Sequence, residues 1–352
     1  MSDYDYLNAR VRGMSTELLS RDFYEQVLSA ASENILLDAL LGSSYGPELQ
    51  EELPRHAADP VSRAIEAALR RNTGATFARL LSAAPPEPRR LIALQLNRWD
   101  VANVVALLRG RLAGVEPHEA LAGTLPIGEL TETQLGELAA ETDVERLAEA
   151  LTTWKQPIGF ELRRAIRECD APADPRALER ALYRAYFTWA LAQLRENDPH
   201  EGLVRQCIRR HIDMMNVVTI LTMIRQKEGT VSGGEELFER GMLKEKSLRE
   251  LRSCETLEHA FETLVDTYLA PGVEKGILTY GQTQSLGVME RFLEAVAVER
   301  ACRFFRQDML GMAVPLGFLW RKYSEYVNLR LLARAALFRM PASTVRLELV
   351  IV

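Results

Sequence analysis

Three stretches of this chain carry an acidic residue followed three positions later by an asparagine. The pairs are Asp100 with Asn103, Asp213 with Asn216, and Glu325 with Asn328. Carboxylates of this kind could act as general acids or bases, or could bind a cation. Residues at i and i+3 also lie on one helix face, where they can bond a neighbouring helix end or loop. The catalytic and the structural interpretation therefore concern the same six side chains.

The apolar surroundings of these pairs favour the structural interpretation. Each pair is followed by aliphatic residues, among them Val104, Val217 and Leu329. A polar group buried there without a partner would cost about 1–3 kcal/mol. We therefore predict that all three asparagines are buried and hydrogen-bonded within their own segment. We predict no catalytic, cofactor-binding or metal-binding role for the six residues.

The spacing of the pairs predicts an internal repeat. The asparagines are separated by 113 and then 112 residues, and leucines precede them by 84, 86 and 85 residues. Those leucines are Leu19, Leu130 and Leu243. Two independent landmarks that keep one spacing indicate three copies of one supersecondary unit. We predict three helical units, at residues 1–112, 113–228 and 229–352.

Each predicted unit contains the elements needed to position its acid and asparagine. An amphipathic helix is expected at residues 32–40, 144–151 and 257–264, from apolar residues at i, i+3 and i+4. An aromatic residue follows each one: Tyr45, Trp154 and Tyr268. A proline (Pro88, Pro199 or Pro315) stands before each asparagine, as at the first turn of a helix. Strand-like alternation is confined to Val345–Val352, so the chain is predicted to be all-α.

Composition argues against several functional classes. The net charge of −6 does not suit a nucleic-acid-binding protein. The four cysteines (Cys169, Cys207, Cys254 and Cys302) form no CxxC motif and are interpreted as reduced, buried thiols of a cytosolic protein. The acidic, polar amino terminus does not predict a signal peptide. The longest uncharged apolar stretch, Met309–Trp320, has 12 residues, whereas a membrane span needs about 20. No membrane crossing is expected.

The sequence also lacks the common phosphate-binding and metal-binding motifs. It contains neither a GxxxxGK[ST] nor a GxGxxG phosphate loop. Glu-x-x-His and adjacent Asp-Asp pairs, which hold metals in helical enzymes, are absent as well. His259 with Glu255 and Glu258 is the cluster of metal-ligating residue types that we single out, and we do not expect a metal there. The chain is predicted not to be an enzyme and to need no cofactor.

Taken together, these features resemble the C subunit of the archaeal and bacterial V/A-type rotary ATPases, which is similar to the d subunit of the eukaryotic V-type ATPase. The resemblance rests on Asp5–Arg12, on Leu18 and Leu19, on the three acid–asparagine helices and on the closing Leu347–Val352. It implies three similar all-helical domains with pseudo-threefold symmetry in a funnel shape. It further implies a non-catalytic adaptor between the D and F subunits of the central stalk and the membrane proteolipid ring. Such a protein is peripheral, at the cytoplasmic face of the membrane.

Residues Gly272–Gly287 do not match the resemblance and are expected to form a loop. The alternative function is a helical scaffold or interaction protein unrelated to rotary ATPases. Units of about 112 residues count against a solenoid of that kind, whose repeats span roughly 20–50 residues.

Overall fold

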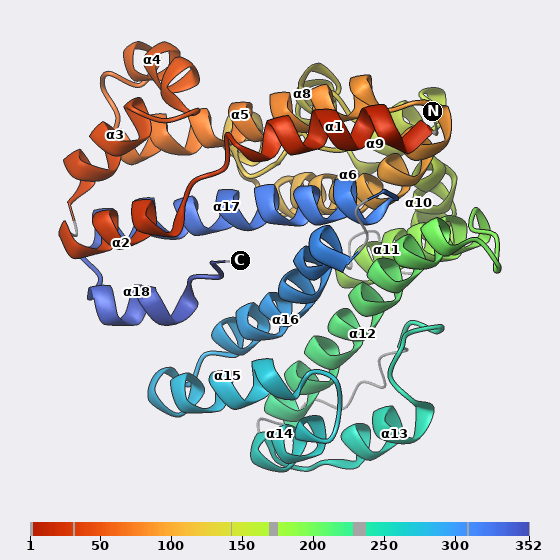
Figure 1. Ribbon diagram of the computed structural model, residues 1–352. Coiled ribbons are helices and arrows are strands. Elements are labelled where there is room, and N and C mark those ends of the chain that lie inside the picture. Colours follow the sequence, from red (N-terminus) through yellow and green to blue (C-terminus); the bar gives the residue numbers. More distant parts are fainter. Residues whose placement is uncertain are drawn as a thin grey trace.

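The computed structural model describes residues 3–30, 32–141, 143–168, 175–227, 237–307 and 310–351, and within these ranges it contains helices and no strand (Figure 1). The all-α prediction is therefore confirmed. The helices are α1 (Asp3–Ser15), α2 (Arg21–Ala30), α3 (Glu33–Leu41), α4 (Gly46–Arg55), α5 (Val61–Ala83), α6 (Pro86–Leu112), α7 (Pro117–Ala122), α8 (Glu132–Ala140), α9 (Val144–Thr153), α10 (Pro157–Glu168), α11 (Pro175–Ala192), α12 (Pro199–Lys227), α13 (Glu245–Ser253), α14 (Leu257–Val265), α15 (Ala270–Thr283), α16 (Leu286–Gln307), α17 (Ala313–Phe338) and α18 (Ala342–Glu348).

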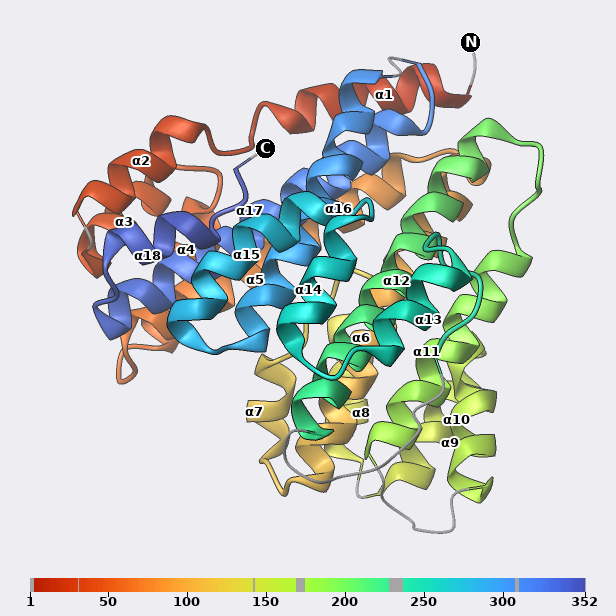
Figure 2. The ribbon, with the colours of Figure 1, turned by 90° about the horizontal axis from the view of Figure 1, so that it is seen from below.

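Three long helices, α6, α12 and α17, carry the three acid–asparagine pairs. All three have proline in their first turn, where the missing N–H would have had no helical partner. The shorter helices gather in three places, with α2–α4, α8–α10 and α13–α15 well separated in Figure 1. Figure 2 shows α13 and α14 lying over α12. Superposition of the three predicted units, and a funnel between them, stay predictions.

The amphipathic helices expected in each unit are present as α3, α9 and α14. Two of them begin at a side chain that caps a free backbone N–H: Asp143 accepts from Arg146 at 2.8 Å, and Thr256 accepts from His259 at 3.3 Å. Ser32 occupies the same position before α3, but its hydroxyl makes no capping bond. Their apolar faces are buried in the core, so the i, i+3, i+4 pattern located them correctly.

The strand-like alternation of Val345–Val352 makes no strand among the described residues, because residues through Glu348 belong to α18. One local expectation was wrong. Residues Gly272–Gly287 are mostly helical rather than a loop, since α15 extends to Thr283. Glycine has a packing role there: a Cβ on Gly272 would lie 2.6 Å from the carbonyl oxygen of Phe292, so only glycine lets α15 approach α16 this closely.

Helix α6 is long and apolar enough, by length and composition alone, to cross a membrane. Of its most apolar stretch, 78% is buried inside the fold, against α5, α11, α12 and other helices. Burial by protein on all sides accounts for the apolar composition of a central core helix.

Two of the three glycines on α15 provide a test of this packing. Gly272→Ala should lower the free energy of unfolding by about 1–3 kcal/mol, because the methyl group must push the Phe292 backbone away. Gly281→Ala, on the same helix with open space around it, should raise it by about 0.5–1 kcal/mol through reduced unfolded-state entropy. Urea unfolding of both variants measures the difference, and equal effects would contradict the close contact of α15 with α16.

Candidate functional site

The three asparagines bind backbone in one repeated geometry. The side-chain amide donates to the carbonyl oxygen, and the side-chain oxygen accepts the N–H, of the residue 22 positions later. The donor–acceptor distances are 2.8 and 2.7 Å for Asn103 with Leu125, 2.8 and 2.8 Å for Asn216 with Phe238, and 2.9 and 3.0 Å for Asn328 with Val350. Each asparagine side chain thus supplies the donor and the acceptor that an extended backbone segment would otherwise obtain from a neighbouring β-strand. We call each such arrangement, with its acid, a clamp.

The acids of the clamps bind the backbone a few residues further along. Asp100 accepts from the N–H groups of Glu129 and Leu130 at 2.7 and 3.1 Å. Asp213 accepts from those of Met242 and Leu243 at 2.8 and 2.9 Å, and Glu325 from that of Leu19 at 2.6 Å. In each case the leucine lies two residues ahead of a helix, namely α8, α13 or α2. Acid and leucine are 30 residues apart at the first two clamps, whereas Leu19 contacts Glu325 near the other end of the chain. Each leucine therefore binds an acid other than the one that follows it in its own predicted unit.

These contacts join successive segments of the chain. Helix α6 clamps the linker into α8, and α12 clamps the linker into α13. Helix α17 clamps residues from both directions, Val350 beyond α18 and Leu19 ahead of α2. Bonding within one segment was expected, and for Asn103 and Asn216 that prediction was wrong. Their partners Leu125 and Phe238 lie beyond the predicted boundaries, because the clamp fastens the linker that leaves each long helix.

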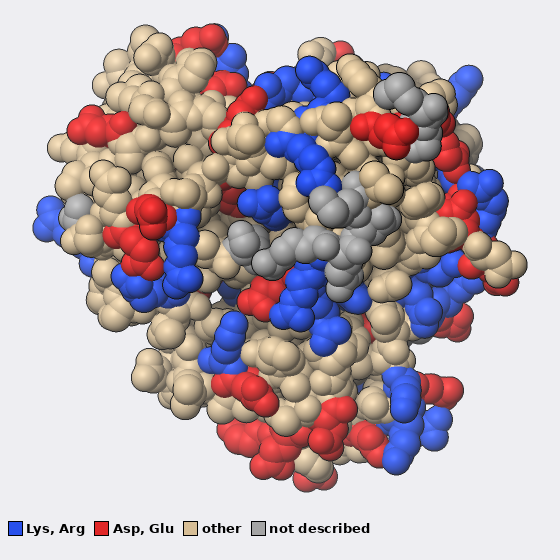
Figure 3. All heavy atoms as spheres, viewed as in Figure 1, with Lys and Arg blue, Asp and Glu red and all other residues tan. Residues whose placement is uncertain are grey.

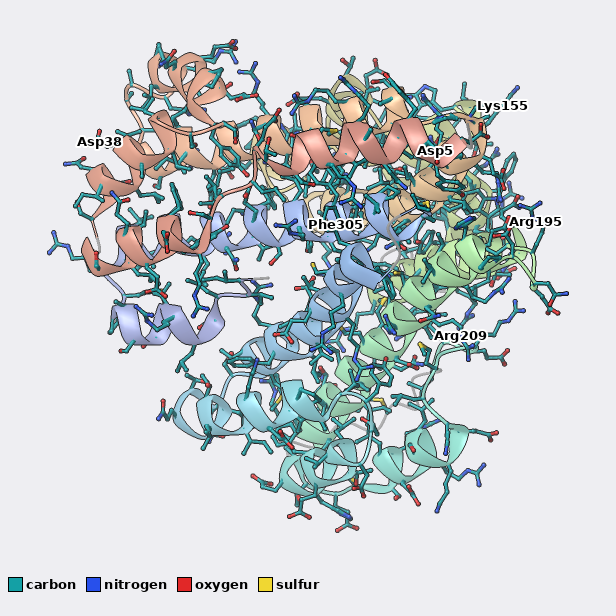
Figure 4. All side chains as sticks on the ribbon, viewed as in Figure 1. Asp5, Asp38, Lys155, Arg195, Arg209 and Phe305 are labelled. Atoms are coloured by element: carbon teal, nitrogen blue, oxygen red, sulfur yellow. The ribbon has the colours of Figure 1, made fainter. Side chains whose placement is uncertain are left out.

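Glycine makes the two continuous linkers possible. A Cβ on Gly128 would overlap the carboxylate of Asp100, and one on Gly241 would overlap that of Asp213. Only a residue without a side chain lets the backbone pass this close to the acid. Arg209, labelled in Figure 4, also holds the second linker by donating to the carbonyl of Gly241 at 2.7 Å. Neither glycine was predicted from the sequence to have a role, although their 113-residue separation repeats that of the first two asparagines.

The third clamp has a different construction. Glu325 accepts from the Tyr45 hydroxyl at 2.7 Å and from the Lys322 ammonium at 2.9 Å, and Lys322 also donates to Asn72 at 2.9 Å. All of these side chains are buried. A cavity of about 270 Å³ lies beside Glu325, between residues 350–351 and residues 18–21. Here two separate segments occupy the place that one continuous linker fills at the other clamps.

Tyrosines complete two of the three acid sites. Tyr268 donates to Asp213 at 2.9 Å, as Tyr45 does to Glu325. These are the aromatic residues that follow α14 and α3, whose hydroxyls the sequence analysis did not assign. The corresponding residue after α9 is Trp154, which has no hydroxyl, and Asp100 is held by backbone donors. Burial raises the pKa of Asp100 to about 7, although the hydrogen bonds from the Glu129 and Leu130 N–H groups act to lower it. Burial also raises the pKa of Asp213.

The six site residues are all buried, with side chains at most 4% exposed. Their carboxylates already accept two or more hydrogen bonds at Asp100, Asp213 and Glu325. Across the described ranges no group of three or more His, Cys, Asp and Glu side chains is placed to hold a metal. Cys207, Cys254 and Cys302 are buried and form no disulfide; Cys169 lies outside the described residues. Buried carboxylates that already accept hydrogen bonds from the protein suit a structural role better than a catalytic one.

Comparison with known proteins gives one consistent result. The family model described as ATP synthase (C/AC39) subunit matches residues 7–348. The chain is 25% identical over 346 residues to the C subunit of the V-type ATP synthase of Deinococcus radiodurans, covering 98% of this chain and 91% of that protein. It is 25% identical over 353 residues to the C subunit of the A-type ATP synthase of Methanosarcina acetivorans, covering 100% and 94%. The corresponding protein of Methanocaldococcus jannaschii is 22% identical over 357 residues, covering 98% and 86%.

The asparagines can be tested one at a time. Asn103→Leu, Asn216→Leu or Asn328→Leu should each lower the free energy of unfolding by about 1–3 kcal/mol, because a buried N–H and a buried C=O both lose their partner. Asn197→Leu is the matched surface control, since Asn197 is exposed. Chemical denaturation of the four variants measures the effect. Midpoints equal to that of the control would contradict a structural role.

The pH dependence of stability tests Asp100. Its pKa rises on folding from 3.8 to about 7, so between these values the folded protein holds a proton that the unfolded chain has lost. The stability contributed by protonated Asp100 is therefore complete below about pH 4 and is lost as the pH rises to about 7. Asp100→Asn cannot titrate, so its stability relative to wild type should improve across this window, by at most about 1.4 kcal/mol per pH unit. Urea titrations at several pH values measure this, and parallel profiles would contradict the raised pKa.

Proposed function

The chain belongs to the ATP synthase C/AC39 subunit family, and from this membership we propose that it is the rotor adaptor that couples the central stalk of a V/A-type ATP synthase to the membrane proteolipid ring. Membership makes it a structural component of that complex rather than a catalytic one. Its proposed partners are the D and F subunits of the central stalk on one side and the ring on the other. Its proposed location is peripheral, at the cytoplasmic face of the membrane. The unrelated helical scaffold is set aside, because the family match covers almost the whole chain.

The observation that carries this proposal is the set of three clamps. A torque-transmitting part must not deform when its partners are loaded, so its segments need to be tied to one another by bonds other than the chain itself. The clamps of α6 and α12 fasten the following linkers, and that of α17 fastens residues near both ends of the chain. Every clamp side chain is buried, where water does not compete for the hydrogen bonds.

An adaptor also needs two distinct binding surfaces. The uneven distribution of charged side chains over the molecule supports their presence. In Figure 3 acidic side chains gather along the lower edge, where α13 and α14 lie in Figure 1. Four exposed acids of this region are Glu255, Glu258, Glu262 and Asp266. A basic surface of one partner would be complementary to this face. In the same view the upper left, around α3 and α4, is mostly uncharged, whereas acidic and basic side chains lie together lower down, near α2 and α18.

Reconstitution of the complex with and without this chain tests the adaptor role. Without it, the soluble catalytic part should still hydrolyse ATP, while ATP-driven ion pumping into vesicles should be lost because the torque path is interrupted. Adding the purified chain back should restore pumping. Full pumping in its absence would contradict the proposal.

Binding experiments with the purified chain provide a second readout. It should bind the isolated D and F subunits and, separately, the detergent-solubilised ring, with neither partner displacing the other. A charge-reversal variant of the acidic face (Glu255, Glu258 and Glu262 to Lys) should weaken one interaction and leave the other unchanged. Competition of the two partners for a single surface would contradict the adaptor geometry.

A further inference from the structure

A small cavity lies where the long helices meet in the centre of the molecule. Its volume is about 10 Å³, and α6, α12, α16 and α17 surround it. The residues that matter for its chemistry are Arg98, Cys207, Arg210, His211, Glu294 and Trp320. On α12, Cys207, Arg210 and His211 follow the i, i+3, i+4 spacing of one helix face, so the sequence directs all three toward the cavity.

Several polar groups on this wall have no hydrogen-bond partner among the described residues. They are Nε and Nη1 of Arg210, Nδ1 of His211 and Nε1 of Trp320, which lies near the Cys207 sulfur but makes no hydrogen bond of normal geometry with it. The remaining guanidinium nitrogen of Arg210, Nη2, donates to Gln206 at 3.3 Å. Arg210 is only 9% exposed, so water at the surface does not satisfy these donors. Buried donors without an acceptor are costly and unusual in native proteins.

The charges around the cavity are also unbalanced. Arg98 lies over the rings of Trp99 and Trp320, at 4.7 and 4.8 Å from their centroids, and forms no ion pair with a described carboxylate. Arg210 likewise forms none and lies over the ring of Phe304 at 5.7 Å. Two cations therefore face the cavity without a directly bonded counter-ion among the described residues. A buried charge without such compensation strongly favours binding an ion of opposite sign.

The other titratable groups on the wall do not supply that negative charge. Glu294 is ion-paired with Arg291 at 3.5 Å and accepts from the Tyr323 hydroxyl at 3.2 Å. Burial raises the pKa of Cys207 to about 11, so its thiol stays protonated. Burial also lowers the pKa of His211, so its imidazole stays neutral. The charge of Asp213, one turn beyond Arg210, acts on the guanidinium, but the hydrogen bonds of this carboxylate go to Met242, Leu243 and Tyr268 and none goes to Arg210.

We propose that this cavity binds one monatomic anion, chloride under cellular conditions, through Arg210 and Trp320. The size of the cavity selects the class of ligand, since a volume of this order holds one water-sized particle. Phosphate, sulfate and carboxylate groups are too large. The bound ion would link α12 to α17 and neutralise the cationic centre formed with Arg98. This inference rests on the cavity alone and does not depend on the adaptor role.

Crystallography of the full chain with bromide tests the proposal directly. Crystals grown in sodium bromide should show one anomalous peak in the cavity, within contact distance of the Arg210 guanidinium and the Trp320 indole N–H. In solution, chloride or bromide should raise the melting temperature along a saturating one-site curve, relative to gluconate at equal ionic strength. A water molecule in the cavity, or a melting temperature that depends on ionic strength alone, would overturn the proposal.

Two substitutions separate the site from general salt effects. Arg210→Met keeps much of the side-chain volume and removes the charge, and Trp320→Phe removes the indole donor. Each should abolish the bromide peak and the chloride-specific part of the melting shift. Arg225→Met is the control, because it makes the same charge change at an exposed position of α12, and it should retain both. If Arg210→Met does not fold, Trp320→Phe decides the question, and an unchanged bromide peak in that variant would overturn the proposed contacts.

Discussion

The pairing of an asparagine side chain with both backbone groups of one distant residue is the interaction on which the rest of the structure depends. Extended linkers must cross buried faces of long helices, and their N–H and C=O groups have no strand or helix partner there. The side-chain amide supplies one donor and one acceptor at the right separation, at Leu125, Phe238 and Val350 alike. Once these groups are satisfied, the linkers can be buried and the short helices that follow are held in place.

The acid three residues before each asparagine binds backbone N–H groups just ahead of a short helix. The third clamp differs from the other two in which segments it joins. At α6 and α12 one continuous linker passes over the carboxylate, with glycine at the point of closest approach. At α17 the bonded residues, Leu19 and Val350, come from segments far apart in the sequence. The longer Glu325, supported by Lys322 and Tyr45, joins segments that the chain does not connect there. Together the three clamps hold the linkers after α6 and α12 and residues near both ends of the chain.

Sequence spacing was sufficient to predict the helical class, the long helices, the second helix of each unit and the burial of the asparagines. These features depend on local periodicity and on the cost of burying polar groups, and both can be read from the amino-acid sequence. The partners of the asparagines were not predictable, because they depend on the path that each linker takes after leaving its helix. The helical state of residues 270–283 was also missed, since glycine there serves close packing against α16. The hydroxyls of Tyr45 and Tyr268 were not assigned a role, because their reach to the acids is a tertiary contact.

Site-resolved hydrogen exchange of the clamped backbone amides tests the central claim most directly. The N–H groups of Leu125, Phe238 and Val350 lie outside regular helices but donate to buried asparagines. The account predicts that all three exchange as slowly as amides in the middle of α6, through opening of a whole unit. Exchange at the rate of exposed loop amides would show that the clamps are open in solution, and it would contradict a structure held together by them.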